Sequence, residues 1–379
     1  MIRLLGGVNN GCVSAPQSED KIIRASWKGG SRQSTREIVY SADQLKYRTV
    51  KQSRRSFIRT AGQGLAWSAL PFGLSADQHF NPHLLNLPED DPLTIGIIGA
   101  ENSHTAAFGK LFNIEKKFPG VHVGYVWGET AEFAQKASEQ GQIPIIVQDP
   151  SEMLGKIQAV IVDHRHPRYH LAAALPFIEA GIPAFVDKPF CYRVDEGRSF
   201  LALARELNTP VTSFSSIAYS SATFDVRDQV QEMEGEIKQI IASGPADLYS
   251  PYGGIFFYGV HLVQPLMFIF GEDIHRVRVT RQGKSATATL AYPDDRLATL
   301  IFKTQHYGWE TWVETKQGMQ QLQSRVPVLD PPLNDTAMVG MFRTRQEPRS
   351  HESILRCVAV LEALEKSAAN EAWVDVEAI

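Results

Sequence analysis

The chain has 379 residues, of which 43% are hydrophobic and 21% are charged, and its formal net charge is -4 at pH 7. This composition is that of a folded globular protein, and the length is sufficient for two domains of ordinary size. The weakly acidic balance offers no basic surface for nucleic acid, so we expect no such partner. Cys12, Cys191 and Cys357 lack metal-ligand spacing, and we expect no metal site.

The first part of the chain carries a candidate export signal. Ser53–Arg59 reads Ser-Arg-Arg-Ser-Phe-Ile-Arg, and a weakly apolar stretch follows. We therefore expect residues 50–76 to be a twin-arginine signal peptide, with export through that machinery, a periplasmic location and no membrane attachment once the signal is removed. An amphipathic basic helix is the alternative. Because such a signal belongs at a chain start, we expect residues 1–49 to be disordered or a non-native extension before a start at Val50.

After an expected linker over residues 77–92, short apolar runs alternate with helical patterns. The sequence predicts strands at 93–98, 121–127, 159–163, 182–186 and 210–214. Helices are predicted around residues 107–112, 129–140, 171–177 and 194–207. This alternation predicts an α/β fold with a doubly wound parallel Rossmann sheet over residues 93–214.

Gly99 follows the first strand, where a dinucleotide-binding domain has the pattern Gly-x-Gly-x-x-Gly. The first glycine is present, but Glu101 and His104 replace the other two. Glu101 adds bulk and negative charge where a pyrophosphate would lie. We expect one of three outcomes: Glu101 turns outward, His104 supplies a compensating donor, or no dinucleotide binds. Asn102 and Ser103 are good helix N-cap residues and would keep the helix end receptive to an anion.

The segment Asp163–His170 is rich in histidine and arginine, and because it follows the fourth strand it should face the crevice at the carboxyl ends of the strands. Its arginines and histidines could recognise an acidic or heavily hydroxylated substrate. Convergence of its histidines on a metal is a weaker alternative. In a third interpretation, His170 packs against the following helix and the arginines are solvated.

Asp187-Lys188-Pro189 follows the fifth strand. Pro189 biases the residues before it toward extended backbone, and Lys188 should point into the same crevice. A surface lysine beside a turn proline is the alternative.

Hairpin-like strands replace the alternation after residue 214. Strands are predicted at 287–292, 297–303 and 308–315, with a helix over about 350–367. Gly253–His261 reads Gly-Gly-Ile-Phe-Phe-Tyr-Gly-Val-His.

The step Asp187-Lys188-Pro189 and the motif Gly253–His261 resemble the Gfo/Idh/MocA family, and the resemblance runs from about Leu93 to the C-terminus. It implies a C-terminal α+β domain over residues 215–379 with an open, mostly antiparallel sheet, through which a homodimer or higher oligomer forms. It also implies NAD or NADP as cofactor and a carbohydrate-like substrate. In the family an acid stands four residues before the histidine matched by His261; here that residue is Phe257, which cannot accept a proton.

The expectation is therefore an exported NAD(P)-dependent oxidoreductase that acts on a sugar, cyclitol or related polyol. Lys188 would stabilise an alkoxide-like oxygen, and His261 would be a general base tuned toward neutral pH. The expected catalytic residues are Lys188, His261, Asp187 and Tyr258. The expected cofactor-binding residues are Gly99, Ala100, Asn102, Ser103, His104, Glu129, His164, His166 and Lys188. The expected substrate-binding residues are Arg165, Arg168, His170, Lys188, Gly254 and His261. Alternatives are a non-redox lyase, hydrolase or epimerase on the same scaffold, and an exported sugar-binding protein without catalysis.

Overall fold

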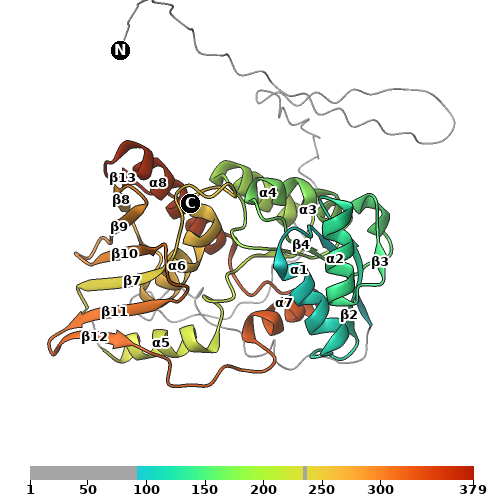
Figure 1. Ribbon diagram of the computed structural model, residues 1–379, viewed down its shortest axis with the longest axis horizontal. Coiled ribbons are helices and arrows are strands. Elements are labelled where there is room, and N and C mark those ends of the chain that lie inside the picture. Colours follow the sequence, from blue (N-terminus) through green and yellow to red (C-terminus); the bar gives the residue numbers. More distant parts are fainter. Residues whose placement is uncertain (1–91, 234–236) are drawn as a thin grey trace, which may run out of the picture. The chain divides into compact units, whose positions relative to one another are not determined.

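The computed structural model describes residues 92–233 and 237–379, which lie in one compact unit spanning Gly73–Ile379 (Figure 1). The predicted extension, the signal peptide and all but the last residue of the predicted linker lie outside the described residues. No helix in the described part of the chain is long and apolar enough to span a membrane.

The first sheet is the predicted doubly wound parallel sheet. Its strand order is β3-β2-β1-β4-β5-β6, and its pairs are parallel. The strands are β1 (Leu93–Ile98), β2 (Val121–Trp127), β3 (Ile145–Ile146), β4 (Ala159–Val162), β5 (Ala184–Val186) and β6 (Val211–Thr212). The strand order reverses between β1 and β4, so the carboxyl ends of these two strands form the crevice in which such sheets bind ligands.

Both faces of this sheet are covered by helices, which explains why its strands read as continuous apolar runs. Side chains alternate between faces along a strand. Ile97 and Phe185 share one hydrophobic cluster with Phe112, whereas Ile98 and Val186 lie in another. The helices after the strands are α1 (Ser103–Gly109), which continues to Ile114 as a wider helical turn, α2 (Ala131–Gly141), α3 (His170–Glu179) and α4 (Val194–Glu206).

The second sheet is mixed and mostly antiparallel, as predicted. Its order is β12-β11-β7-β10-β9-β8-β13, and within it β7 and β10 pair in parallel. The strands are β7 (Gln239–Pro245), β8 (Arg276–Gln282), β9 (Ser285–Ala291), β10 (Leu297–Lys303), β11 (Glu310–Thr315), β12 (Gly318–Leu322) and β13 (Val374–Asp375). In β8, Val277 and Val279 are buried, whereas the alternating Arg276, Arg278 and Thr280 are exposed, so one face is covered and the other is open.

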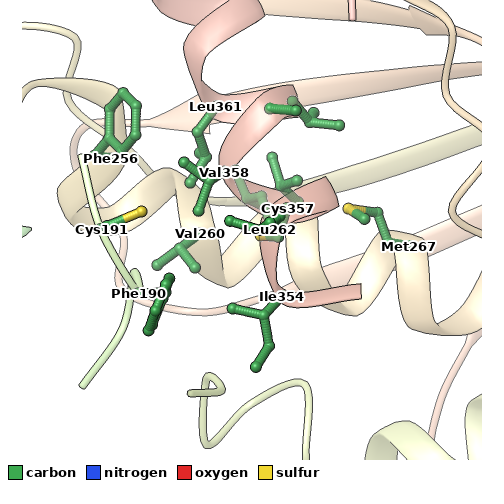
Figure 2. Close-up of a cluster of buried hydrophobic side chains, with 14 of the residues drawn as sticks. Phe190, Cys191, Phe256, Val260, Leu262, Met267, Ile354, Cys357, Val358 and Leu361 are labelled. Atoms are coloured by element: carbon green, nitrogen blue, oxygen red, sulfur yellow. The ribbon is translucent and has the colours of Figure 1, made fainter. Parts of the chain in front are cut away.

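Three helices pack with the second sheet: α5 (Ser221–Glu232), α6 (Ile255–Phe270) and α8 (His351–Asn370). Figure 2 shows side chains of α6 and α8 meeting Phe190 and Cys191, the residues that follow Lys188-Pro189. Phe190 and Cys191 are both buried. The close packing of Phe190 and Cys191 against α6 and α8 fixes the backbone next to Lys188, because closely packed side chains are held in single rotamers.

Helix α7 (Leu333–Thr344) belongs by sequence to the second half of the chain but packs on the first sheet. Its residues Ala337, Met338 and Met341 are buried in the same cluster as Ile97 and Phe185. Residue 214 therefore separates the two sheets along the chain, while the apolar core of the first sheet includes a helix from much later in the sequence.

Candidate active site

Gly99 forms a tight turn between β1 and α1. Its φ is +110°, and a Cβ on it would lie 2.7 Å from the backbone carbon of Asp163 and 2.8 Å from the backbone nitrogen of His164. A side chain is therefore excluded both by conformation and by the approach of the chain after β4. The first position of the dinucleotide fingerprint keeps its structural role.

Glu129 closes this turn from the end of β2. Its Oε2 accepts hydrogen bonds from the backbone amides of Ala100 (2.8 Å) and Glu101 (2.9 Å), and its Oε1 lies 2.8 Å from Nδ1 of His164. Burial alone would raise the pKa of Glu129, but these hydrogen bonds outweigh it and lower the pKa to about 2. The backbone amide of Glu129 itself also lowers this pKa, so the carboxylate is held in its charged form by donors of the protein.

Glu101, which replaces the second glycine, points away from the turn. The hydroxyl of Tyr252 donates to its Oε1 at 2.7 Å, and Nη1 of Arg165 lies 4.0 Å from the same oxygen. Arg165 also donates to the Tyr252 hydroxyl at 3.0 Å and stacks over that ring, 4.1 Å from its centroid. Of the three expected outcomes for Glu101, the structure shows the outward turn. Arg165 is thereby engaged with Glu101 rather than free for a substrate.

Two buried carboxyl groups, Asp163 and Asp187, follow β4 and β5. Nδ2 of Asn102 donates to both, at 2.8 Å and 3.2 Å. The hydroxyl of Thr105 lies 2.6 Å from the carbonyl oxygen of Gly99 and 2.6 Å from Oδ2 of Asp163. A hydroxyl has one proton to donate. We infer that Thr105 donates to Gly99 and that a protonated Asp163 donates to Thr105.

The charges of the neighbouring groups agree with this assignment. Burial and the proximity of Asp187 raise the pKa of Asp163 well above its usual value. Burial also opposes ionisation of Asp187, but His104 and Lys188 outweigh it and hold the pKa of Asp187 below its usual value. The cluster thus holds one neutral carboxyl and one carboxylate, as expected where two such groups share a site.

Asp187 holds two cationic side chains. Its Oδ2 lies 3.2 Å from Nδ1 of His104 and 3.7 Å from Nζ of Lys188. Asp187 raises the pKa of His104 above its usual value, in spite of partial burial. The His104 side chain is 38% exposed, whereas those of Asp187 and Lys188 are buried. His104 therefore connects the buried pair to solvent, and it contacts Asp187 where we expected a contact to cofactor.

His104, Asp163 and Asp187 also present ligand atoms within 4.8 Å of one another, the spacing of a metal site. The proton on Asp163 and the ammonium group of Lys188, 3.7 Å from Asp187, both oppose a bound cation. The group is better described as a charge-balanced network within the protein.

His170 has a structural role, and its expected role in substrate binding is wrong. It is fully buried, with Nδ1 3.0 Å from the carbonyl oxygen of Pro189 and Nε2 2.7 Å from that of His164. Both ring nitrogens face backbone carbonyl groups, which excludes His170 as a metal ligand; because burial lowers its pKa, the neutral ring donates its single proton to one of the two. The ring ties the segment after β4 to the loop that carries Lys188.

His166 and Gly254 lie together, but not beside the Gly99 turn. They line a separate cavity of about 430 Å³ with Tyr192 and Tyr249. Burial, followed by the nearby Arg168, lowers the pKa of His166 to about 4, so its ring is neutral. Nδ1 of His166 accepts from the backbone amide of Arg168. The expected cofactor contact of His166 and substrate contact of Gly254 therefore lack support from the geometry.

Arg168 and Tyr258 each lie against aromatic rings. The guanidinium of Arg168 lies over the Tyr169 ring at 5.1 Å, which matches the solvated-arginine interpretation. The Tyr258 ring lies between those of His261 and Tyr307, 6.0 Å from each.

His261 is buried on α6 and hydrogen-bonds Ser215, with 2.7 Å between Nδ1 and Oγ. Ser215 Oγ also accepts from the backbone amides of Ile217 (3.1 Å) and Ala218 (3.4 Å). Two amide donors fill its acceptor positions, so Ser215 must donate to Nδ1, and the proton of the neutral imidazole is then on Nε2. Burial, followed by the charge of Lys188, lowers the pKa of His261 well below its usual value.

These facts correct the expectation that His261 is a general base tuned toward neutral pH. In this tautomer Nε2 donates, so the ring supplies a hydrogen bond rather than accepting a proton. His261 lines a cavity of about 370 Å³ together with Ser243, Trp309, Glu310 and Gln321, a lining that suits hydroxyl groups. Lys188 lines a different cavity, of about 350 Å³.

Sequence reasoning missed several members of the network. Asp163 could have been found, because it ends a buried strand in the same way as Asp187. Thr105, Ser215 and Asp335 gave no signal, since each acts through a contact that only the folded chain creates.

The fold and the site define a Rossmann protein with a second, mostly antiparallel sheet and an acid–lysine–imidazole cluster at the carboxyl edge of the first. Residues 93–214 match the Gfo/Idh/MocA family, described as an oxidoreductase family with an NAD-binding Rossmann fold. The match covers the Rossmann part of the chain and shows the likeness of that part to the family. A search of curated proteins finds no match.

Solved structures share the fold over most of the chain. One is an oxidoreductase from Agrobacterium radiobacter in complex with NAD+, L-tartaric acid and magnesium, with 15% identity and a TM-score of 0.61, covering 75% of this chain and 98% of that one. A second is scyllo-inositol dehydrogenase from Lactobacillus casei with NAD(H) and scyllo-inositol, with 14% identity and a TM-score of 0.63, covering 75% and 99%. A third is myo-inositol dehydrogenase from Lactobacillus casei with NAD(H) and myo-inositol, with 15% identity and a TM-score of 0.61, covering 76% and 98%.

At these identities the likeness shows the fold alone. The predicted α/β architecture is confirmed, and a nicotinamide dinucleotide is confirmed as the cofactor type of the matched family.

Proposed function

We propose that the protein is an exported NAD-dependent oxidoreductase that acts on a hydroxyl group of a sugar, cyclitol or related polyol. The observation that carries the proposal is the cluster of Lys188, Asp187 and His104, which lies beside a Gly99 turn that keeps its tight geometry. The inositol complexes of structural neighbours support the substrate class. The twin-arginine pattern at Ser53–Arg59 supports export.

The residues at the Gly99 turn fit a dinucleotide. The turn excludes any Cβ, Glu101 is directed away, and Asn102 caps α1 so that the helix N-terminus faces the crevice. The Glu129 side chain is 25% exposed and would accept a hydrogen bond from a ribose hydroxyl. Because Glu129 is ionised at neutral pH, it would repel the extra phosphate of NADP, and we propose NAD as the cofactor.

In the proposed reaction NAD supplies the hydride acceptor when it is bound. The ammonium group of Lys188 donates to the reacting oxygen and stabilises negative charge there as the hydride leaves. Asp187 holds Lys188 in place at 3.7 Å. As the hydroxyl proton moves to Lys188, Lys188 passes one of its own protons through Asp187 to Nδ1 of a neutral His104, so that the ammonium group is restored and the proton ends on a partly exposed imidazole. His261 and Lys188 line different cavities, but Lys188 acts electrostatically on His261, and Nε2 of His261 would donate a further hydrogen bond to a substrate that spans both cavities.

Two measurements test this proposal. Calorimetric titration of the purified protein should detect NAD binding and at least tenfold weaker NADP binding, an estimate that follows from the charge at Glu129. With NAD and a panel of cyclitols and sugars, absorbance should report formation of the reduced cofactor, and Lys188→Ala should abolish it while leaving the circular dichroism spectrum unchanged. Absence of any nucleotide binding, or full activity of the variant, would refute the assignment.

Export needs its own experiment. In cells that carry the chain with a reporter fused at its C-terminus, changing Arg54 and Arg55 together to Lys should retain the protein inside the cell. Equal export of both forms would exclude the twin-arginine route.

A further inference from the structure

A cavity of about 350 Å³ lies between α1 and α7, beside the first sheet. Its volume is at the lower end of the range for small-molecule sites. Eight of its residues are polar: His104, Lys110, Glu115, Asp187, Lys188, Ser216, Asn334 and Asp335. The remaining wall is apolar: Ala107, Phe108, Leu111, Phe185, Phe214 and Met338. The lining reaches along α1 well beyond its first turn, so the cavity extends away from the Gly99 turn.

The polar groups gather in one place. His104 and Lys188 both contact Asp187, at 3.2 Å and 3.7 Å. His104 also acts electrostatically on Asp335, and Asn334 donates to the Asp335 carboxyl at 2.8 Å. The cavity is therefore amphipathic, with one polar cluster and an apolar wall.

The polar cluster has a positive balance. It contains the cationic Lys188 and a His104 whose pKa Asp187 raises, against one carboxylate, Asp187. Burial raises the pKa of Asp335 to about 7, so this carboxyl is largely neutral in mildly acidic solution. Two further charged groups of the lining, Lys110 and Glu115, pair with each other at 3.4 Å and cancel.

We propose that this cavity binds a small monocarboxylate with an apolar, ring-sized body. The carboxylate pairs with His104 and Lys188, and the body packs against Phe108, Phe185 and Met338. Such a ligand is chemically unlike a polyol. Its site shares His104 and Lys188 with the reaction centre but extends from them along α1, away from the Gly99 turn. Because His104 and Lys188 also serve the proposed proton path, an occupied cavity inhibits turnover.

Binding is measured by calorimetry without nucleotide, so the result does not depend on redox activity. The probes are phenylacetate, its neutral analogue phenylacetamide, and acetate, which lacks the ring. We expect phenylacetate to bind about tenfold more tightly than either of the others, because only it uses both the charge and the apolar wall. No measurable heat with phenylacetate overturns the proposal. Equal affinity of phenylacetamide overturns the carboxylate assignment, and equal affinity of acetate overturns the role of the apolar wall.

Two substitutions locate the site. Ala107→Phe fills part of the cavity from an exposed helix position and should weaken phenylacetate binding about tenfold. Ala131→Phe, at an exposed position of α2 outside this lining, is the matched control and should have no effect. Asp335→Asn removes a carboxyl that is ionised above about pH 7 and should strengthen binding severalfold at about pH 8. Equal binding by Ala107→Phe and Ala131→Phe places the ligand elsewhere and refutes the site.

Discussion

Asp163 and Asp187 follow neighbouring strands, and a single amide group, Nδ2 of Asn102, donates to both carboxyl groups. The two acids nevertheless differ in charge. Asp163 is surrounded by donors and acceptors that suit a protonated carboxyl, whereas Asp187 contacts His104 and Lys188. One negative charge is thereby confined to the side chain that positions the proposed catalytic lysine.

Replacing Asp163 by Asn tests its protonation. Because the folded-state pKa of Asp163 is raised, the unfolded chain releases a proton that the folded chain keeps, and stability falls as pH rises above the unfolded pKa. The amide of Asp163→Asn carries no such cost. We expect the free energy of unfolding of the variant to equal or exceed that of the parent at about pH 7.5. The difference between the two should become smaller toward about pH 4.5.

Urea denaturation at both pH values measures this difference. Asp163→Ala is the comparison, since it leaves Thr105 and Asn102 without their buried partner and should cost about 2 kcal/mol. If Asp163→Asn were as damaging as Asp163→Ala at neutral pH, the carboxyl would have to be ionised.

Replacing Glu129 by Gln tests the acid at the end of β2. The glutamine amide removes the charge and turns one acceptor into a donor that faces the amides of Ala100 and Glu101. We expect NAD affinity to fall about tenfold or more, together with a smaller preference for NAD over NADP, both by calorimetry. Glu139→Gln, on the exposed side of α2, is the control and should leave both affinities unchanged.

The titration of His104 should produce one limb in the pH profile of the reaction rate. Asp187 raises its pKa, so His104 is protonated below that pKa and able to accept a proton above it. Oxidation of the alcohol should therefore speed up as pH rises through this pKa, and reduction of the ketone should slow down. Initial rates in both directions across neutral pH measure the effect. His104→Gln should lose the limb in both directions; a profile identical to the parent's would assign the limb to another group.

Ser215 should control the tautomer of His261. Removing the hydroxyl in Ser215→Ala leaves Nδ1 without its donor, so the imidazole proton is no longer fixed on Nε2. We expect kcat to fall about tenfold while NAD affinity is unchanged. Ser215→Thr keeps the hydroxyl and should recover most of the rate. A loss of the same size in both variants would indicate that packing, rather than the hydrogen bond, is responsible.

The fold followed from local patterns, and much of the site did not. The bounds of β1, β2 and β10 agree with the predicted ranges because buried strands have a clear apolar signature. Lys188 was predicted to enter the crevice from the direction of its strand; its side chain is buried 3.7 Å from Asp187, and its contact with a substrate stays a prediction.

The roles of the histidines needed coordinates. His170 and His164 are six residues apart in one segment, yet the ring of His170 lies between two backbone carbonyl groups and the ring of His164 contacts Glu129. The composition of this segment and the spacing of its histidines would be the same if the two rings exchanged their partners, so neither could predict the contacts. Which nitrogen of His261 carries the proton depends on Ser215, 46 positions earlier, so the sequence offers no pattern from which to infer it.

Helix α7 has a consequence for how this chain is made. Ile97 and Phe185 share their hydrophobic cluster with Met338 and Met341, which a ribosome adds more than 150 residues after Phe185. Until that helix is synthesised, one hydrophobic face of the nascent first sheet stays exposed, and such a surface binds chaperones and promotes aggregation. Versions of the gene that stop short of Leu333 should therefore yield insoluble product, although they encode every strand of both sheets apart from β13.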